Sequence, residues 1–215
     1  MSLRTEKVLS LILWAIMAGF AVWGHFNLPD GPMAVHFDIS GNANGFAPRD
    51  VAILMMPGVA LGVALLMLWV LPTIMPKGLE RSAAAYGAVT MAITALLTLI
   101  QAMLILSAAG MAIDHIKTVS IGVGVVFIIL GNYLPKTRLN YVMGIRTPWT
   151  LSDERVWDKT HRFAGPLFML GGALAIGAAF MGPQWHLIGL LGGVGMPVVA
   201  SLAYSYLAAK KLNLV

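Results

Sequence analysis

Long apolar stretches alternate with short polar segments along the 215-residue chain. A transmembrane helix needs about 20 mostly apolar residues, because each residue adds about 1.5 Å across roughly 30 Å of hydrocarbon. Six such stretches occur, and their central parts carry no Asp, Glu, Lys or Arg. They are Val8–Phe26, Val51–Met75, Ala83–Gly110, Val119–Leu134, Phe163–Met181 and Trp185–Ala209. We therefore expect an all-α integral membrane fold with six transmembrane helices, forming one polytopic domain over residues 1–215.

The composition argues against a soluble protein. Hydrophobic residues make up 59% of the chain and charged residues 11%, with a mean hydropathy of +0.83. A soluble domain usually carries about 25% charged residues, and this chain has too few to cover a water-exposed surface. The chain also contains no cysteine, which excludes disulfides, thiolate metal ligands and cysteine nucleophiles.

Lysine and arginine are distributed unevenly between alternate loops. One set of loops and termini carries twelve of the 14 basic residues, whereas the other set carries only Arg49 and Lys117. Cytoplasmic loops of membrane proteins are enriched in Lys and Arg, so we expect both termini in the cytoplasm and residues 27–50 outside. The net charge of +5 is then a topology signal and gives no reason to expect direct nucleic-acid binding.

The exterior segment 27–50 has the pattern of a small strand followed by a turn. Val35, Phe37 and Ile39 alternate with His36 and Asp38, which is a period of two, and a Gly- and Asn-rich stretch follows. On a strand His36 and Asp38 would point the same way, with Asp30 as a possible neighbour. The candidate exterior ligand- or peptide-binding residues are Asp30, His36, Asp38, Asn42 and Asp50.

Three interpretations of the His36–Asp38 pair stay open. The two side chains could form a hydrogen bond that holds the hairpin, contact a peptide or other ligand, or bind a metal, although two candidate ligands without a third are a weak metal signal. The other exterior turns, Ala112–Thr118 and Gly182–Gln184, are expected to be too short to form a site.

The predicted cytoplasmic segment 132–162 changes from an irregular loop to an amphipathic helix. Ser152 is the expected N-cap of this interfacial helix, which leads into the fifth span, and Asp158 and Arg162 form an i,i+4 pair. We expect the segment to pack on the helix ends with Arg146 and His161 close together. The candidate coupling or partner-binding residues are Asn132, Pro135, Arg146, Thr147, Trp149, Trp157, His161 and Arg162.

Two G-x-x-x-G patterns lie inside predicted spans. Gly58 and Gly62 are in the second span, and Gly189 and Gly193 are in the sixth. Small residues at this spacing let helix backbones approach closely, either inside one bundle or between the subunits of a homodimer.

Two stretches of the chain resemble known families. Gly131–Lys136, Asn140–Tyr141, Gly144–Leu151 and Val156–Arg162 resemble the SdpI family of bacterial membrane immunity proteins, with a core at 118–209. Leu28–Asp30, Val35–Asp38 and Gly41–Phe46 are similar to the small domain of unknown function that often precedes that core, here within residues 1–80. The resemblance implies a protein of the bacterial cytoplasmic membrane that gives resistance to a secreted peptide toxin and signals to a cytoplasmic repressor.

A transporter and a membrane enzyme are the two other function classes that the sequence leaves open. A small-molecule transporter or permease would use a broken helix, such as one interrupted at Gly192–Pro197, but its spans would usually carry ionisable groups. A membrane enzyme would rely on His161 with Asp158, or on His36 with Asp38. No H-E-x-x-H, G-x-S-x-G or phosphate-binding loop occurs, so we predict that the protein is not an enzyme and uses no cofactor.

Overall fold

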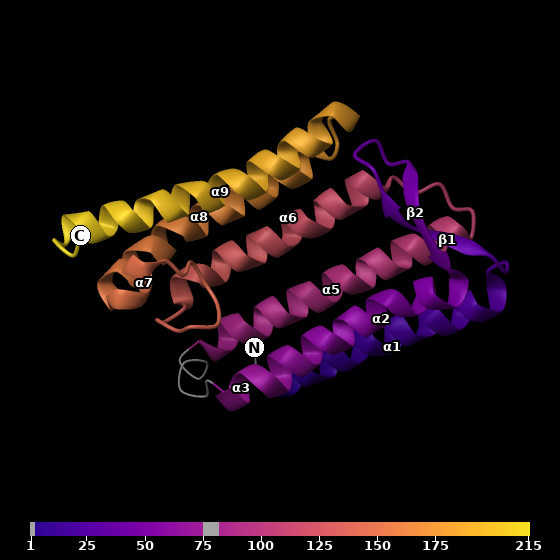
Figure 1. Cartoon of the computed structure of the whole chain (residues 1–215), viewed down its shortest axis with the longest axis horizontal. Coiled ribbons are helices and arrows are strands. Elements are labelled where there is room, and N and C mark those ends of the chain that lie inside the picture. The colour runs from indigo at the N-terminus through magenta and orange to yellow at the C-terminus, as the bar shows by residue number, and fades with distance from the viewer. Residues whose placement is uncertain (1–2, 75–81) are drawn as a thin grey trace.

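The computed structural model describes residues 3–74 and 82–215, and most of these residues are helical (Figure 1). The strands are β1 (Pro32–Phe37) and β2 (Ala43–Pro48). The helices are α1 (Leu3–Asn27), α2 (Arg49–Leu65), α3 (Leu71–Ile74), α5 (Ala83–Ala108), α6 (His115–Tyr133), α7 (Pro148–Ser152), α8 (Glu154–Ala178) and α9 (Pro183–Lys211). Two short segments, the π-helical η1 (Leu66–Val70) and the 3₁₀-helical η2 (Leu134–Lys136), extend α2 and α6.

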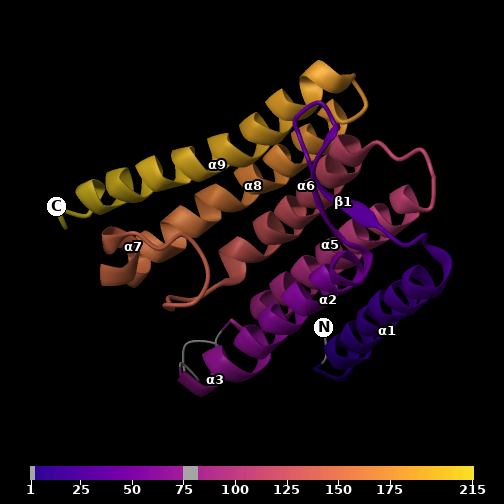
Figure 2. The ribbon, with the colours of Figure 1, turned by 45° about the vertical axis from the view of Figure 1, so that its right-hand side comes forward.

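The long helices run side by side in one elongated bundle (Figures 1 and 2). α5 packs against α1, α2 and α6, and α8 packs against both α6 and α9. The antiparallel strands β1 and β2 lie at one end of the bundle, which we call the hairpin end. α1 begins and α9 ends toward the opposite end, which also carries α7 and residues 137–147 and which we call the loop end (Figure 1).

Four helices of the described chain are long and apolar enough to cross a membrane. They are Val8–Asn27, Ala83–Ala108, His115–Lys136 and Gln184–Lys211, so four of the six predicted spans are met. α2 ends as a regular α-helix after 17 residues, where the chain continues through η1 into α3. α8 carries charged residues from Glu154 to Arg162 before its apolar part. Met75, the expected end of the second span, lies outside the described residues.

Glycines allow α6, α8 and α9 to touch backbone to backbone. A Cβ on Gly172 of α8 would come within 2.4 Å of the Gly124 carbonyl oxygen on α6. On the other side of α8, a Cβ on Gly171 would come within 2.0 Å of the Gly193 carbonyl oxygen on α9. The expected backbone approach at Gly193 is therefore found inside this bundle, where side chains larger than hydrogen do not fit.

The other G-x-x-x-G pattern has no such partner. A Cβ on Gly58 or Gly62 would meet no atom within 4 Å, so this face of α2 is open in the described chain. α9 continues as one helix through Gly192–Pro197, with Pro197 inside it.

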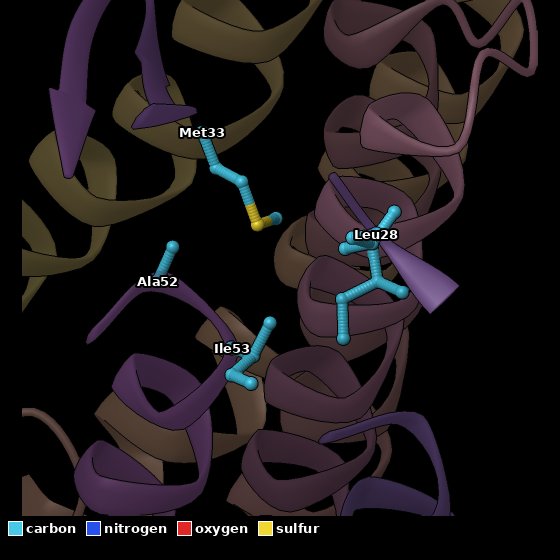
Figure 3. Packing of buried hydrophobic residues seen from close by; sticks show 5 residues of the cluster. Leu28, Met33, Ala52 and Ile53 are labelled. Atoms are coloured by element: carbon cyan, nitrogen blue, oxygen red, sulfur yellow. The ribbon is translucent and has the colours of Figure 1, made fainter. Parts of the chain in front are cut away.

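A small apolar cluster fixes the hairpin to the helices beneath it. Met33 of β1 is buried against Leu28, which follows α1, and against Ala52 and Ile53 of α2 (Figure 3). Ile105 of α5 completes the cluster. The hairpin predicted from the period-two pattern therefore has a buried face, and its position on the bundle is determined by that face.

Candidate functional site

The hairpin turn is built around the carboxylate of Asp38. β1 ends at Phe37, so Asp38 lies in the turn and not on the strand. Its Oδ1 atom accepts the backbone N–H groups of Ser40 at 2.8 Å and Asn42 at 2.9 Å. The bond from the Asn42 backbone is the main cause that lowers the pKa of Asp38 below its usual value. Asp38 is thus a fixed negative charge at the tip of the hairpin.

His36 does not form the expected pair with Asp38. Its Nδ1 atom is hydrogen-bonded to Oδ1 of Asn44 on the opposite strand. The strand register is irregular on both sides of His36, where the residue faces Gly45, and this irregularity moves Asp38 off the face that simple alternation assigns to it. The interpretation of a His36–Asp38 bond is therefore wrong, and His36 supports the hairpin through Asn44.

Arg49 organises the base of the hairpin. Its guanidinium lies 2.6 Å from a carboxylate oxygen of Asp30 and 3.1 Å from one of Asp50, and it donates to the carbonyl of Leu28 at 3.2 Å. Asp50 also accepts a hydrogen bond from His25 at 3.0 Å, and this bond is the largest cause that lowers the pKa of Asp50. The five exterior candidates thus separate into a tip group, Asp38 and Asn42, with His36 behind it, and a base group, Asp30 and Asp50.

The hairpin reaches across the bundle to the other half of the chain. The ring of Phe37 stacks on that of His115 with centroids 3.8 Å apart. A cavity of about 220 Å³ lies beside this stack, between the hairpin turn, residues 113–116 and His186 of α9. The short turn at 112–118 therefore lines this cavity together with the hairpin.

Metal binding has no ready cluster here. In the parts of the chain that the structure describes, no group of three or more His, Asp or Glu side chains lies close enough to hold a metal ion.

At the loop end, His161 is buried and bonded on both ring nitrogens. Its Nδ1 atom lies 2.8 Å from the carbonyl oxygen of Trp157, and its Nε2 atom accepts the backbone N–H of Ile145 at 2.9 Å. A carbonyl oxygen only accepts, so the proton must be on Nδ1 and the ring must be neutral. Burial lowers the pKa of His161 to about 4, in agreement with this tautomer.

Gly144 lets the loop lie directly on that histidine. Its φ is +109°, and a Cβ there would come within 2.4 Å of the His161 Nε2 atom and 3.0 Å of the Trp157 ring. Trp157 is fully buried, stacks on His161, and donates its indole N–H to the carbonyl of Thr137 at 3.2 Å. Residues 137–147 are therefore held by α8 and form no floppy linker.

A second set of hydrogen bonds shapes the turn into α7. Thr147 and Thr150 form a reciprocal cap, in which each hydroxyl accepts the other residue's backbone N–H at 3.1 and 2.9 Å. The prediction that Ser152 caps the interfacial helix is wrong by one residue. Ser152 ends α7, and Asp153 caps α8 by accepting the Arg155 N–H at 2.7 Å.

The remaining loop-end candidates lie around the loop 137–147. Arg146 is exposed and donates to the Tyr141 carbonyl at 2.7 Å, one residue from the Ile145 N–H that binds His161. Asp158 lies 3.5 Å from Arg138 instead of pairing with Arg162. The other positions are Asn132, bonded to Lys136 at 3.2 Å, Pro135, packed on Gly165, Trp149, 5.2 Å from the Tyr206 ring, and Arg162, exposed on α8.

Known protein families match parts of the chain at both the hairpin end and the loop end. Residues 136–205 match the model of the SdpI/YfhL protein family, and residues 11–61 match a domain of unknown function, DUF1648. The segment 136–205 is thus similar to the SdpI family. This segment contains the loop 137–147, α7, α8 and most of α9. The DUF1648 segment contains most of α1, the hairpin and much of α2.

A curated relative carries the same family name. The chain is 32% identical over 118 residues to the immunity protein SdpI of Bacillus subtilis (strain 168), a match that covers 55% of this chain. The chain spans 57% of that relative's length. No solved structure matches the chain. The membrane-length helices and the similarity to the SdpI family together indicate a membrane protein.

Proposed function

We propose that this protein is a membrane immunity protein that protects a bacterial cell from a secreted peptide toxin. The similarity to a protein named immunity protein SdpI supports the proposal. In the proposed arrangement the chain lies in the cytoplasmic membrane, with both termini inside and the hairpin end outside. The twelve-to-two distribution of basic residues favours this orientation, because it puts the loop end on the cytoplasmic side.

Two further segments would cross the bilayer in this arrangement. α2, η1 and α3 follow one another without a gap from Arg49 to Ile74. The apolar part of α8, from Phe163 to Ala178, runs beside α6 and α9 (Figure 1). Charged residues at the start of α8 would then lie among the lipid headgroups, where long basic side chains extend to water.

The single observation that carries the toxin contact is the shape of the hairpin. Its tip presents the fixed Asp38 carboxylate next to the side chain of Ile39, which is 70% exposed, and Phe46, 60% exposed, lies farther along β2 opposite Ala34. A surface that combines a negative charge with exposed apolar side chains fits an amphipathic peptide arriving from outside. The base carboxylates of Asp30 and Asp50 are already paired with Arg49, so the tip offers the freer charge.

The loop end would face the cytoplasm and contact a partner protein there. Arg146, in the loop 137–147, and Arg162 of α8 are exposed, and the half-buried Trp149 lies at the same end. We propose this surface as the place where a repressor would bind, with no catalytic step and no cofactor. A homodimer through the open Gly58–Gly62 face of α2 remains part of the proposal for assembly.

Survival under toxin challenge tests the proposed function. A toxin-sensitive host expressing the wild-type chain should survive, and the double variant His36→Ala with Asp38→Ala should lose protection. Asp38→Asn is a more specific variant, because it retains a side-chain oxygen for the turn but removes the negative charge. Membrane abundance of a tagged copy is measured beside survival. Full protection by Asp38→Asn and by the double variant at normal abundance would show that the hairpin tip does not contact the toxin.

A further inference from the structure

The cavity at the hairpin end has a buried polar side chain without a partner among the described residues. His186 lies in the first turn of α9, is 4% exposed, and lines the cavity of about 220 Å³. Within residues 3–74 and 82–215, neither of its ring nitrogens forms a hydrogen bond. The side chain as a whole is buried while its ring nitrogens stay accessible, so this unpaired imidazole facing an open space can bond a group that enters from outside.

The other walls of the cavity define what that group should be. Ile113 and Ile116 on one side and Ile39 on the other form apolar walls. Asp114 contributes a carboxylate, one oxygen of which accepts the Lys117 backbone N–H at 2.9 Å and which retains further acceptor capacity. Asp114 carries the only permanent charge among the described residues that line the cavity.

The basic side chain of Lys117, in the first turn of α6, does not neutralise Asp114 from within this cavity. The ammonium group of Lys117 lies over the ring of Phe180, 4.4 Å from its centroid, and Lys117 does not line the cavity. The cavity therefore combines an unneutralised carboxylate, an imidazole that can accept a hydrogen bond, and apolar walls. Lysine and arginine side chains have matching parts, an apolar stem and a cationic donor head.

We propose that this cavity binds one lysine or arginine side chain of a peptide, with the cationic head between Asp114 and His186. At about 30 Å³ per water molecule, the space would hold about seven waters, which suits a single long side chain and excludes a folded segment. The identification of the peptide as the toxin rests on the proposed function. The side-chain class rests only on the cavity.

The geometry also makes this a site shared by the two family segments. Ile39 and Ser40 come from the hairpin of the DUF1648 segment, and His186 comes from the SdpI-family segment. The stack of Phe37 on His115 forms the adjoining wall and joins the hairpin to the start of α6, which lies between the two matched segments. A bound side chain would therefore contact both segments at once.

Histidine NMR of the full chain in detergent micelles or lipid nanodiscs tests the proposal directly. The probes are Nα-acetyl-lysine N-methylamide, the arginine equivalent, and the norleucine equivalent, which has an apolar stem without the charge. We expect saturable shifts of the His186 and His115 imidazole signals with the first two probes. The His161 signal, at the other end of the bundle, should not move. Equal shifts with norleucine amide, or no saturable shift, would overturn the proposal.

Asp114→Asn is the decisive variant, because asparagine caps a helix about as well as aspartate but carries no charge. We expect it to weaken lysine-probe binding by roughly tenfold or more. Asp153→Asn, which alters the N-cap of α8 at the loop end, is the matched control and should bind normally. Unchanged binding in Asp114→Asn would contradict the site. His186→Gln checks the same pocket from the α9 side if Asp114→Asn lowers the yield of folded protein.

The survival assay separates this proposal from the proposed function. If the wild-type chain binds the lysine probe but gives no protection, the proposed function fails and the cavity assignment stands. If the chain protects cells but shows no saturable probe binding, the cavity assignment fails and the immunity role stands. Loss of both probe binding and protection in Asp114→Asn, at normal membrane abundance, would identify the cavity as the anchor point for the toxin.

Discussion

The Nε2 atom of His161 accepts the backbone N–H of Ile145 at 2.9 Å, and this bond holds the loop 137–147 against α8. The loop passes over the histidine at Gly144, where the chain has a positive φ and no space for a Cβ. A helix residue and a loop residue 16 positions apart thus depend on each other, since a neutral imidazole is required on one side and a glycine on the other.

Replacing Gly144 with alanine should open this loop. The new Cβ would meet the His161 ring and would also be strained at φ +109°, so we expect a loss of about 1–3 kcal/mol in unfolding free energy. Gly110→Ala is the matched control, because Gly110 has φ +90° but open space around it. The measurement is thermal unfolding in detergent, together with trypsin cleavage at Arg146. Equal effects of the two substitutions would mean that the contact with His161 contributes nothing.

The closed loop should also be sensitive to acid. The pKa of His161 in the folded protein is about 4, below the ordinary value of 6.5, so the folded state binds fewer protons than the open state. Its stabilising effect is therefore complete above pH 6.5 and is lost as the pH falls toward 4. Trypsin cleavage cannot span this range, so Trp157 fluorescence or hydrogen exchange at Ile145 is the suitable readout. A His161→Gln variant should lose this pH dependence, and an unchanged profile in that variant would assign it to another group.

Glycine contacts between α6, α8 and α9 predict opposite outcomes for two substitutions on one helix. Gly172→Ala places a methyl group 2.4 Å from the Gly124 carbonyl oxygen, so it should destabilise the bundle by about 1–3 kcal/mol. Gly177→Ala meets no atom within 4 Å and should be neutral or slightly stabilising, because alanine favours the helix. Unfolding in mixed micelles measures both. Equal stability of the two variants would show that α6 and α8 do not touch along this line.

The orientation in the membrane has its own test. Reporter fusions at Pro48, in β2, and at Val215, at the end of the described chain, should report opposite sides, with Pro48 outside and Val215 inside. The expectation follows from the concentration of basic residues in the loops at one end of the bundle. Finding both fusions on the same side would refute the arrangement with an outer hairpin and an inner loop.

Local sequence patterns predicted the elements well and their contacts poorly. The period-two pattern at Val35–Ile39 predicted a strand, and the apolar stretches predicted long helices, because both signals depend on neighbours in the chain. The partner of His36 could not be read in the same way. A register irregularity of one residue directs Asp38 into the turn, and such irregularities leave little trace in a single sequence.

The residues that sequence reasoning missed are those whose partners lie far along the chain. His25 pairs with Asp50, 25 positions away, and His186 reaches the hairpin turn across more than half of the sequence. The loop end was anticipated better, because Gly144, Trp157 and His161 lie within 18 residues of one another. Even there, the asparagine and threonine hydrogen bonds that shape the loop, such as Asn140 to the Met143 N–H at 2.8 Å, were not foreseen.

α9 joins the two ends as one rod of 29 residues, with His186 near one tip and Tyr206 near the other. Between them, its backbone touches α8 at Gly193. At about 1.5 Å per residue, one arm is about 10 Å long and the other about 20 Å. A rigid tilt about Gly193 would therefore move Tyr206, and the Trp149 ring beside it, about twice as far as His186 and in the opposite direction.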